Sequence, residues 1–208
     1  MKKLMAVAAA SMFMVSACCQ KEEKTAVAVK SNAEIAIENI MTRSSVRAYT
    51  SQKPSEGQID TILRAAFAAP TGMNRQPWAF VVVDDRALLD TMAGFLPGAP
   101  MLEESQVAIV VCGDLLLAPK DVAGHNYWEQ DCSAATENLL LATHALGLGA
   151  VWTGVFPSPE KVAFVQSVLQ MPENLIPLAV MPIGYPDEPQ KIKDKWDANK
   201  VYYNTCVR

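Results

Sequence analysis

The sequence predicts one folded domain of mixed helices and strands, and three observations support this. Half of the 208 residues are hydrophobic, which is enough for a sizeable core in a chain too short for two domains of ordinary size. Short runs rich in β-branched residues alternate with longer segments of helical periodicity. Glycine, proline and helix-capping residues separate these segments. We therefore expect the domain to cover residues 31–208.

The N-terminal segment predicts export. Two lysines precede an uncharged run that ends at Ala17 and is shorter than the roughly 20 apolar residues needed to span a bilayer. Residues 15–18 resemble the lipobox of bacterial lipoproteins, whose cysteine, here Cys18, is lipidated. A plain secretory signal with an incidental cysteine is the alternative. We expect a lipoprotein signal peptide in residues 1–17, a solvated tether in residues 18–30, and an exported protein held on the periplasmic or cell-surface side of a membrane by its lipid alone.

Charge and cysteine content argue against several classes of function. A net charge of −4, a pI near 5.2 and the lack of a basic stripe make nucleic acid an unsuitable partner. Beyond the N-terminal region, Cys112, Cys132 and Cys206 have neither metal-site nor Cys-x-x-Cys spacing, so we expect buried small hydrophobic side chains. His125 and His144 are too few and too far apart for a zinc site, and we expect no metal.

Capping residues mark the starts of the first two predicted helices. Ser31 with Glu34, and Ser55 with Gln58, have the spacing of capping boxes, in which each side chain bonds to the other residue's backbone amide. Apolar residues at helical spacing follow both pairs. The first helix is expected to end near Thr42, and the second leads into a loop described below.

Two strands and a short helix are predicted next. Residues 80–83 and 107–112 are almost continuously β-branched or aromatic, which indicates strands buried on both faces. Between them, Asp85 can cap a short helix. Residues 94–100 are rich in glycine and proline and predict an irregular loop.

The longest helical pattern covers residues 132–146 and ends at Gly147. Apolar residues cover most of its circumference, so we expect this helix to be buried, either centrally or against a second subunit. A strand over residues 151–156, a helix capped by Ser158 and a strand over residues 178–181 complete the predicted domain.

Residues 69–78 predict a ligand loop between an apolar helix and a buried strand. Pro70 and Gly72 interrupt regular structure, and the amides of Asn74 and Gln76 can both donate and accept hydrogen bonds. These groups suit a flat heterocycle with polar edges better than a phosphate or a metal. An ordinary helix-to-strand connection is the alternative.

Two basic segments are candidates for binding a phosphate. Arg43 and Arg47, with Ser44 and Ser45 between them, follow the first helix and can hold a phosphate or a ribityl chain. Basic residues at a helix C-terminus also stabilise the helix dipole, which is the alternative. Residues 191–197 contain three lysines, and a solvated charge run is the alternative there.

Four elements, in this order and spacing, resemble the nitroreductase family of FMN-dependent oxidoreductases. They are the segment 43–47, the loop 70–78 with its Asn-x-Gln-Pro-Trp motif, the helix 131–148 followed by Trp-Thr-Gly at 152–154, and Gly-Tyr-Pro at 184–186 before the basic tail. The resemblance implies an α+β fold in three layers (α/β/α) with a mainly antiparallel central sheet. It also implies an intertwined homodimer with two FMN sites at the subunit interface.

The resemblance assigns residues to each part of FMN. The implied residues are Arg43, Ser44 or Ser45, and Arg47 for the phosphate, ribityl chain and pyrimidine edge; Pro70, Thr71, Gly72, Asn74 and Gln76, some of them from the partner subunit, for the ring; Thr153, Gly154 and Val155 for the reducible nitrogen; and Lys193 and Lys195 closing on the phosphate. In many relatives an arginine stands where this chain has Lys195. Lysine keeps the charge but loses the bidentate fork, so we expect weaker binding of the phosphate there.

The implied activity is the transfer of two electrons from NAD(P)H through FMN to nitroaromatic, quinone or similar acceptors by a ping-pong mechanism, with no side chain as general acid or base. Phe95, Tyr127 and Trp128 would lie on the substrate side, or else in the core or the dimer interface. Reduced nicotinamide is scarce outside the cytoplasm, so a membrane electron donor is an alternative. Two further alternatives are a flavin dehydrogenase or dehalogenase of the same fold, and a lipid-anchored electron-transfer module without turnover.

Overall fold

The computed structural model describes residues 29–118 and 126–206. The chain divides into two units, residues 1–31 and 32–208, and the fold below is that of the second. The predicted signal peptide, the lipidation site Cys18 and His125 lie outside the described residues, as does the tether up to residue 28. Within the described part of the chain, no helix combines the length and the apolar character needed to cross a membrane.

An open five-stranded sheet forms the centre of the domain. Four strands follow the order β1-β2-β5-β3, and β4 also pairs with β5. Every ladder between these strands is antiparallel, which confirms the predicted mainly antiparallel sheet. The strands are β1 (Trp78–Val83), β2 (Val107–Asp114), β3 (Gly149–Ala150), β4 (Thr153–Gly154) and β5 (Leu175–Gly184).

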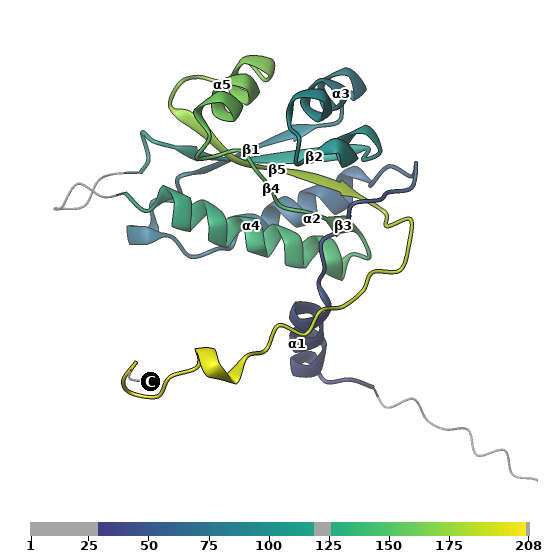
Figure 1. The fold of residues 1–208 in the computed structure, drawn as a ribbon, viewed down its shortest axis with the longest axis vertical. Helices are drawn as coiled ribbons and strands as arrows, with labels where there is room; N and C mark the ends of the chain where they lie inside the picture. Colours follow the sequence, from purple (N-terminus) through teal and green to yellow (C-terminus); the bar gives the residue numbers. More distant parts are fainter. Residues whose placement is uncertain (1–28, 119–125, 207–208) are drawn as a thin grey trace, which may run out of the picture. The chain divides into compact units, whose positions relative to one another are not determined.

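Helices cover both faces of this sheet, which confirms the predicted three layers. One face carries α2 and α4, and the opposite face carries α3 and α5 (Figure 1). The helix α1 precedes the sheet in the chain and contacts α4. The helices are α1 (Asn32–Thr42), α2 (Glu56–Phe67), α3 (Arg86–Phe95), α4 (Trp128–Ala145) and α5 (Pro159–Val168), with short 3-10 turns η1 (Gly72–Asn74), η2 (Pro100–Glu103) and η3 (Ala198–Lys200).

The central strand β2 contains almost no polar residue because both of its faces are buried. Ile109 and Val111 point into the core under α2 and α4, whereas Val110 and Cys112 point into the core under α3. Successive side chains of a strand face opposite sides, so a central strand between two helical layers must be apolar at every position. The predicted strand at residues 107–112, buried on both faces, is therefore confirmed.

The helix caps predicted at Ser55, Asp85 and Ser158 are formed. Ser55 Oγ accepts from the amide of Gln58, and the Gln58 side chain accepts from the Ser55 amide, so the capping box of α2 is complete. Asp85 accepts from the Leu88 amide at the start of α3. Ser158 caps α5 in the same way. These contacts span three residues, so local sequence determines them.

Several boundaries differ from the prediction. The strand predicted at 80–83 is the edge strand β1, which pairs with β2 alone. Both of its faces pack against core residues, but most of its side chains are only half-buried and Val82 is 41% exposed, so its burial is less complete than predicted. Of the single strand predicted at 151–156, only the two residues of β4 form a strand, and the two residues of β3 precede the predicted range. Helix α3 continues to Phe95 and η2 begins at Pro100, so less of the segment 94–100 is irregular than predicted.

The described cysteines are free thiols, and two of three follow the prediction. Cys112 and Cys132 are buried, and burial raises the pKa of both thiols to about 12, so they remain protonated and behave as small hydrophobic side chains. Cys206 is exposed, contrary to the expectation of burial, because it lies in the tail beyond the sheet. Among residues 29–118 and 126–206, no group of three potential ligands is placed to hold a metal ion.

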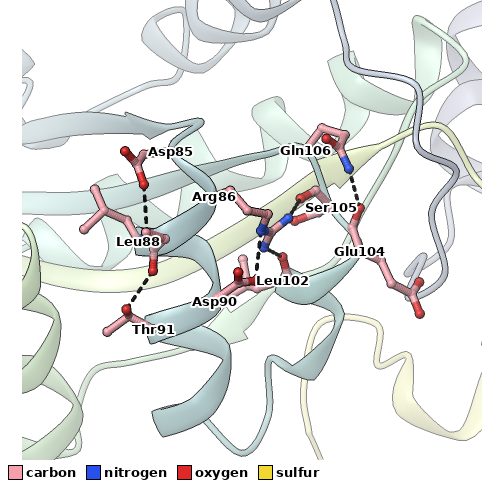
Figure 2. A network of polar contacts seen from close by, with 10 residues as sticks. Asp85, Arg86, Leu88, Asp90, Thr91, Leu102, Glu104, Ser105 and Gln106 are labelled. Atoms are coloured by element: carbon pink, nitrogen blue, oxygen red, sulfur yellow. Dashed lines mark hydrogen bonds and ion pairs between the residues drawn. The ribbon is translucent and has the colours of Figure 1, made fainter.

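Arg86 joins α3 to the turn η2 (Figure 2). Its guanidinium donates to the carbonyl of Leu102 and, over 2.9 Å, to that of Ser105, and its Nε lies 2.8 Å from Asp90 Oδ1. Leu102 lies at the end of η2, where backbone acceptors lack partners within the helix, and Ser105 follows two residues after the turn ends.

We expect Arg86→Ala to lower the free energy of unfolding by about 1–2 kcal/mol, because two carbonyls lose a charged donor that is partly exposed to water. Asp90→Ala should cost less than about 0.5 kcal/mol, since it removes only a surface ion pair within one helix. Urea unfolding of both variants measures the difference, and equal losses would contradict this role of the two carbonyls.

Candidate functional site

The predicted phosphate segment, residues 43–47, lies against the end of the sheet. Ser45 forms a parallel bridge with Ala150 of β3, and the Val46 amide donates to the Ala150 carbonyl over 3.0 Å. A Cβ added at Gly149 would lie 2.5 Å from Cγ2 of the buried Val46, so glycine permits this close approach. The backbone of the segment is therefore fixed by β3.

Helix α4 supports the same segment through its side chains. Arg43 Nε lies 3.5 Å from Glu137 Oε1, and the Arg43 side chain is only 16% exposed. One residue earlier, Thr42 Oγ1 lies 2.9 Å from His144 Nε2. Burial and the positive charge of Arg43 lower the pKa of His144 below its ordinary value of 6.5, so its ring is neutral at pH 7. Arg47 and Ser45 are exposed, and Ser44 is half-buried.

The predicted ring loop, residues 70–77, lies near the start of α4. The Gly72 amide donates to Asp131 Oδ1 over 2.8 Å, and a Cβ added at Gly72 would lie 3.4 Å from the Tyr127 ring. Within the loop, the Gln76 amide donates to Thr71 Oγ1 over 3.2 Å. The first turn of α4 thus holds one end of the loop.

The backbone of this loop has an uncommon conformation. Met73, Asn74 and Gln76 have φ values of 54°, 54° and 51°. These values lie in the left-handed region, which residues other than glycine seldom adopt. The side chains of Asn74 and Gln76 are exposed and bonded to each other over 3.0 Å. Residues with such strained backbone conformations are common at ligand sites. Pro70, also predicted to line the ring, is exposed at the start of the loop.

Of the three residues predicted beside the reducible nitrogen, only Gly154 is open. Thr153 is buried and its hydroxyl donates to the Val180 carbonyl, and the Val155 amide donates to the Leu178 carbonyl over 3.0 Å. Gly154 is exposed, and the nearest atom to a Cβ built there is a backbone oxygen 4.0 Å away. A flat ligand can therefore approach the backbone at Gly154.

The phosphate segment and the ring loop do not meet within one chain. The former contacts α4 at Glu137 and, through Thr42, at His144, whereas the latter contacts it at Asp131. A helix rises 1.5 Å per residue, so Asp131 and His144 are about 20 Å apart. Figure 1 shows α4 running toward β3 and α1 at its C-terminal end. No hydrogen bond or ion pair joins the two segments within residues 29–118 and 126–206. Lys193 and Lys195 lie exposed beyond β5.

The three predicted substrate-side aromatics are in different environments. Tyr127 is 40% exposed and packs beside Gly72 of the ring loop. Trp128 is buried in the core under α2 and α4. Phe95 stacks on Phe164 of α5, with ring centroids 3.8 Å apart, on the opposite face of the sheet. The structure therefore places only Tyr127 next to the ring loop.

Two residues of this region are absent from the prediction: Asp131 and Glu137. Both lie on α4, and they contact the ring loop and the phosphate segment. Asp131 is a carboxylate on the buried side of α4, beside Cys132. A charge in such a position is costly unless it is bonded, and this signal could have identified Asp131 in the sequence.

Comparisons with known proteins agree with this architecture. The family model described as "Nitroreductase family" matches residues 40–108 and 96–185. A protein of Methanothermobacter thermautotrophicus with the provisional name NADH dehydrogenase/NAD(P)H nitroreductase is 40% identical over 166 residues, covering 80% of this chain and 85% of the relative. A crystal structure under the same provisional name from Parabacteroides distasonis has a TM-score of 0.77 at 44% identity, covering 82% and 98% of the two chains. An FMN-dependent nitroreductase from Clostridium difficile has a TM-score of 0.72 at 28% identity, covering 81% and 99%. The chain belongs to the nitroreductase family.

Proposed function

We propose that the protein is an FMN-dependent oxidoreductase that passes two electrons from NAD(P)H to nitroaromatic, quinone or similar acceptors. The observation that carries this proposal is the pair of segments that α4 supports, a cationic one at Arg43 and an amide-bearing loop at Asn74. The names of the relatives above, which include an FMN-dependent nitroreductase, point to the same chemistry.

The chemistry of the side chains present fits FMN. Arg43 and Arg47 supply guanidiniums and Ser44 a hydroxyl, which are the donors that a phosphate prefers. The exposed amides of Asn74 and Gln76 can pair with the polar edge of a flavin ring.

Each segment has a distinct task in this proposal. Arg43, oriented by Glu137, binds the phosphate, and Lys193 and Lys195 add positive charge. The backbone at Gly154 is accessible to the ring, since among the described residues no side-chain atom lies within 4.0 Å of a Cβ built there. Bound FMN supplies the two-electron chemistry, so the chain binds, orients and shields it and needs no general acid or base.

A homodimer completes this site. Helix α1 has no buried residue in the single chain, and it exposes Ile35, Ile37, Ile40 and Met41. Clustered exposed apolar residues mark an interface. In the proposed intertwined dimer, each chain gives its phosphate segment to one flavin and its ring loop to the other, which explains why these segments are apart in one chain.

The proposed location is the outer side of a membrane, with residues 1–17 as a lipoprotein signal peptide and Cys18 as the lipidated residue. The sequence of the N-terminus supports this location. NAD(P)H is scarce there, so a reduced membrane carrier is the second candidate donor.

Visible absorption of the purified protein, recorded before and after anaerobic addition of NADH or NADPH, tests the proposal. We expect a flavin spectrum that bleaches with the nicotinamide and returns when a nitroaromatic or a quinone is added. A flavin spectrum that persists with NAD(P)H but bleaches with a quinol would move the donor to the membrane. If no flavin binds even after FMN is added, the proposed function is refuted.

A further inference from the structure

We propose that Asp131 is the positioning residue of the flavin-ring loop, residues 70–77, and that it acts through the Gly72 amide. This inference rests on the proposed function, because it assigns to Asp131 the task of holding the loop against the ring. The two residues are 59 positions apart in the sequence, and the contact joins a helix to the loop across the fold.

The geometry is that of a strong hydrogen bond. Asp131 Oδ1 accepts from the Gly72 amide over 2.8 Å, and Asp131 is only 8% exposed. A hydrogen bond from a backbone amide to a carboxylate is about twice as strong as one between neutral groups. Burial strengthens it further, since little water competes for either partner.

Capping of the helix start does not explain the carboxylate at this place in α4. Acidic residues near a helix start commonly cap its free amides, but α4 begins at Trp128 without a side-chain cap. The Asp131 amide already donates to the Tyr127 carbonyl, so this residue lies within the hydrogen-bonded helix. Burying a charge there costs free energy that a bond to the loop offsets.

The loop needs an external tie because its own conformation is strained. Met73, Asn74 and Gln76 are in the left-handed region. The hydrogen bonds of Gln76 to Thr71 and Asn74 join residues of the loop to each other and do not connect the loop to the core. At its far end, the Asp114 amide donates to the Pro77 carbonyl over 2.6 Å. Asp131 is the side-chain tie at the near end and can be removed without changing the loop sequence.

The test measures the affinity of the full-length protein for FMN and for riboflavin, by flavin fluorescence, in the wild type, Asp131→Ala and Asp131→Asn. We expect Asp131→Ala to weaken the binding of both flavins by a similar factor of about 10 to 100, because the loop lines the ring that they share. The loss of affinity in Asp131→Asn should be several-fold smaller, because the uncharged amide oxygen of asparagine still accepts the hydrogen bond from Gly72. The visible absorption band of bound FMN should shift toward that of free FMN in the same order.

A matched control is Glu129→Ala, which removes another carboxylate from the first turn of α4. It should bind both flavins as the wild type does. An equal loss in Glu129→Ala would assign the effect to the helix dipole and overturn the proposal. Wild-type affinity and an unshifted band in Asp131→Ala would overturn it too, as would Asp131→Asn binding no better than Asp131→Ala.

Hydrogen exchange of the peptide covering residues 70–77, measured without flavin, separates this inference from the proposed function. We expect faster exchange at Gly72 in Asp131→Ala and an intermediate rate in Asp131→Asn, with exchange elsewhere in α4 and the sheet unchanged. A protein that binds no flavin would refute the proposed function. An unchanged exchange rate at Gly72 in Asp131→Ala would refute the role of the Asp131–Gly72 hydrogen bond in holding the loop, whether or not flavin binds.

Discussion

Replacing Arg43 with alanine is expected to weaken FMN binding about 10- to 150-fold and to leave the affinity for riboflavin unchanged. A hydrogen bond to a charged group is worth about 1.5–3 kcal/mol, and riboflavin lacks the phosphate that accepts it. Arg43 is suited to this role because Glu137 holds its partly buried guanidinium beside β3. Fluorescence titration of the two flavins gives both affinities.

Arg64→Ala is the matched control for the lost positive charge. Arg64 is exposed on α2, and its bond is to Asp60 in the same helix. We expect this variant to bind both flavins as the wild type does. Equal weakening of FMN and riboflavin by Arg43→Ala would show that the segment 43–47 does not bind the phosphate.

Replacing Leu139 with alanine is expected to lower the free energy of unfolding by about 2–5 kcal/mol. Leu139 is fully buried in the core between α4 and the sheet, so its truncation leaves a cavity in rigid surroundings. Because α4 also holds the ring loop and the phosphate segment, flavin affinity should fall in the same variant. Urea unfolding at a fixed protein concentration measures the stability, since a dimer would make it concentration-dependent.

Leu116→Ala makes the same chemical change at a residue that is 78% exposed. Its unfolding free energy should stay within about 0.5 kcal/mol of the wild type. If Leu139→Ala costs less than about 1 kcal/mol, α4 can repack around the cavity and is not the rigid support that the structure indicates.

A common feature of these predictions is that α4 supports both proposed halves of the site. Asp131 in its first turn holds the ring loop, and Glu137, two turns later, holds Arg43. The buried apolar face of α4, which includes Leu139, packs on the sheet between these contacts. The relative placement of the two halves therefore depends on the packing of one helix.

Much of the fold follows from short-range sequence signals. The capping box of Ser55 and Gln58 and the cap at Asp85 involve residues three positions apart, and both are formed as predicted. The unbroken apolar run in β2 shows directly that the strand is covered on both faces. The Asn-x-Gln-Pro-Trp motif, at residues 74–78, is likewise a local signal, and it indicates the family within five consecutive positions.

Long-range contacts decided what these signals could not. The sequence of β1 is as apolar as that of β2, but its position at the edge of the sheet leaves Val82 exposed. Phe95 and Trp128 are equally suited to line a pocket, yet one stacks on α5 and the other enters the core. Such positions depend on which elements pack together, and local periodicity does not contain that information.

The sequence by itself predicted most of the helices and strands, indicated the family and named candidate residues for binding a flavin. Only the tertiary structure decided which of these residues are held in place, which side chains hold them, and how far apart the phosphate segment and the ring loop lie. It brought Asp131 to Gly72 over 59 positions and Arg43 to Glu137 over a still longer separation. It also placed the two segments at separate parts of α4. The physical reason is that a hydrogen bond or ion pair between distant residues forms only after packing has brought their elements together.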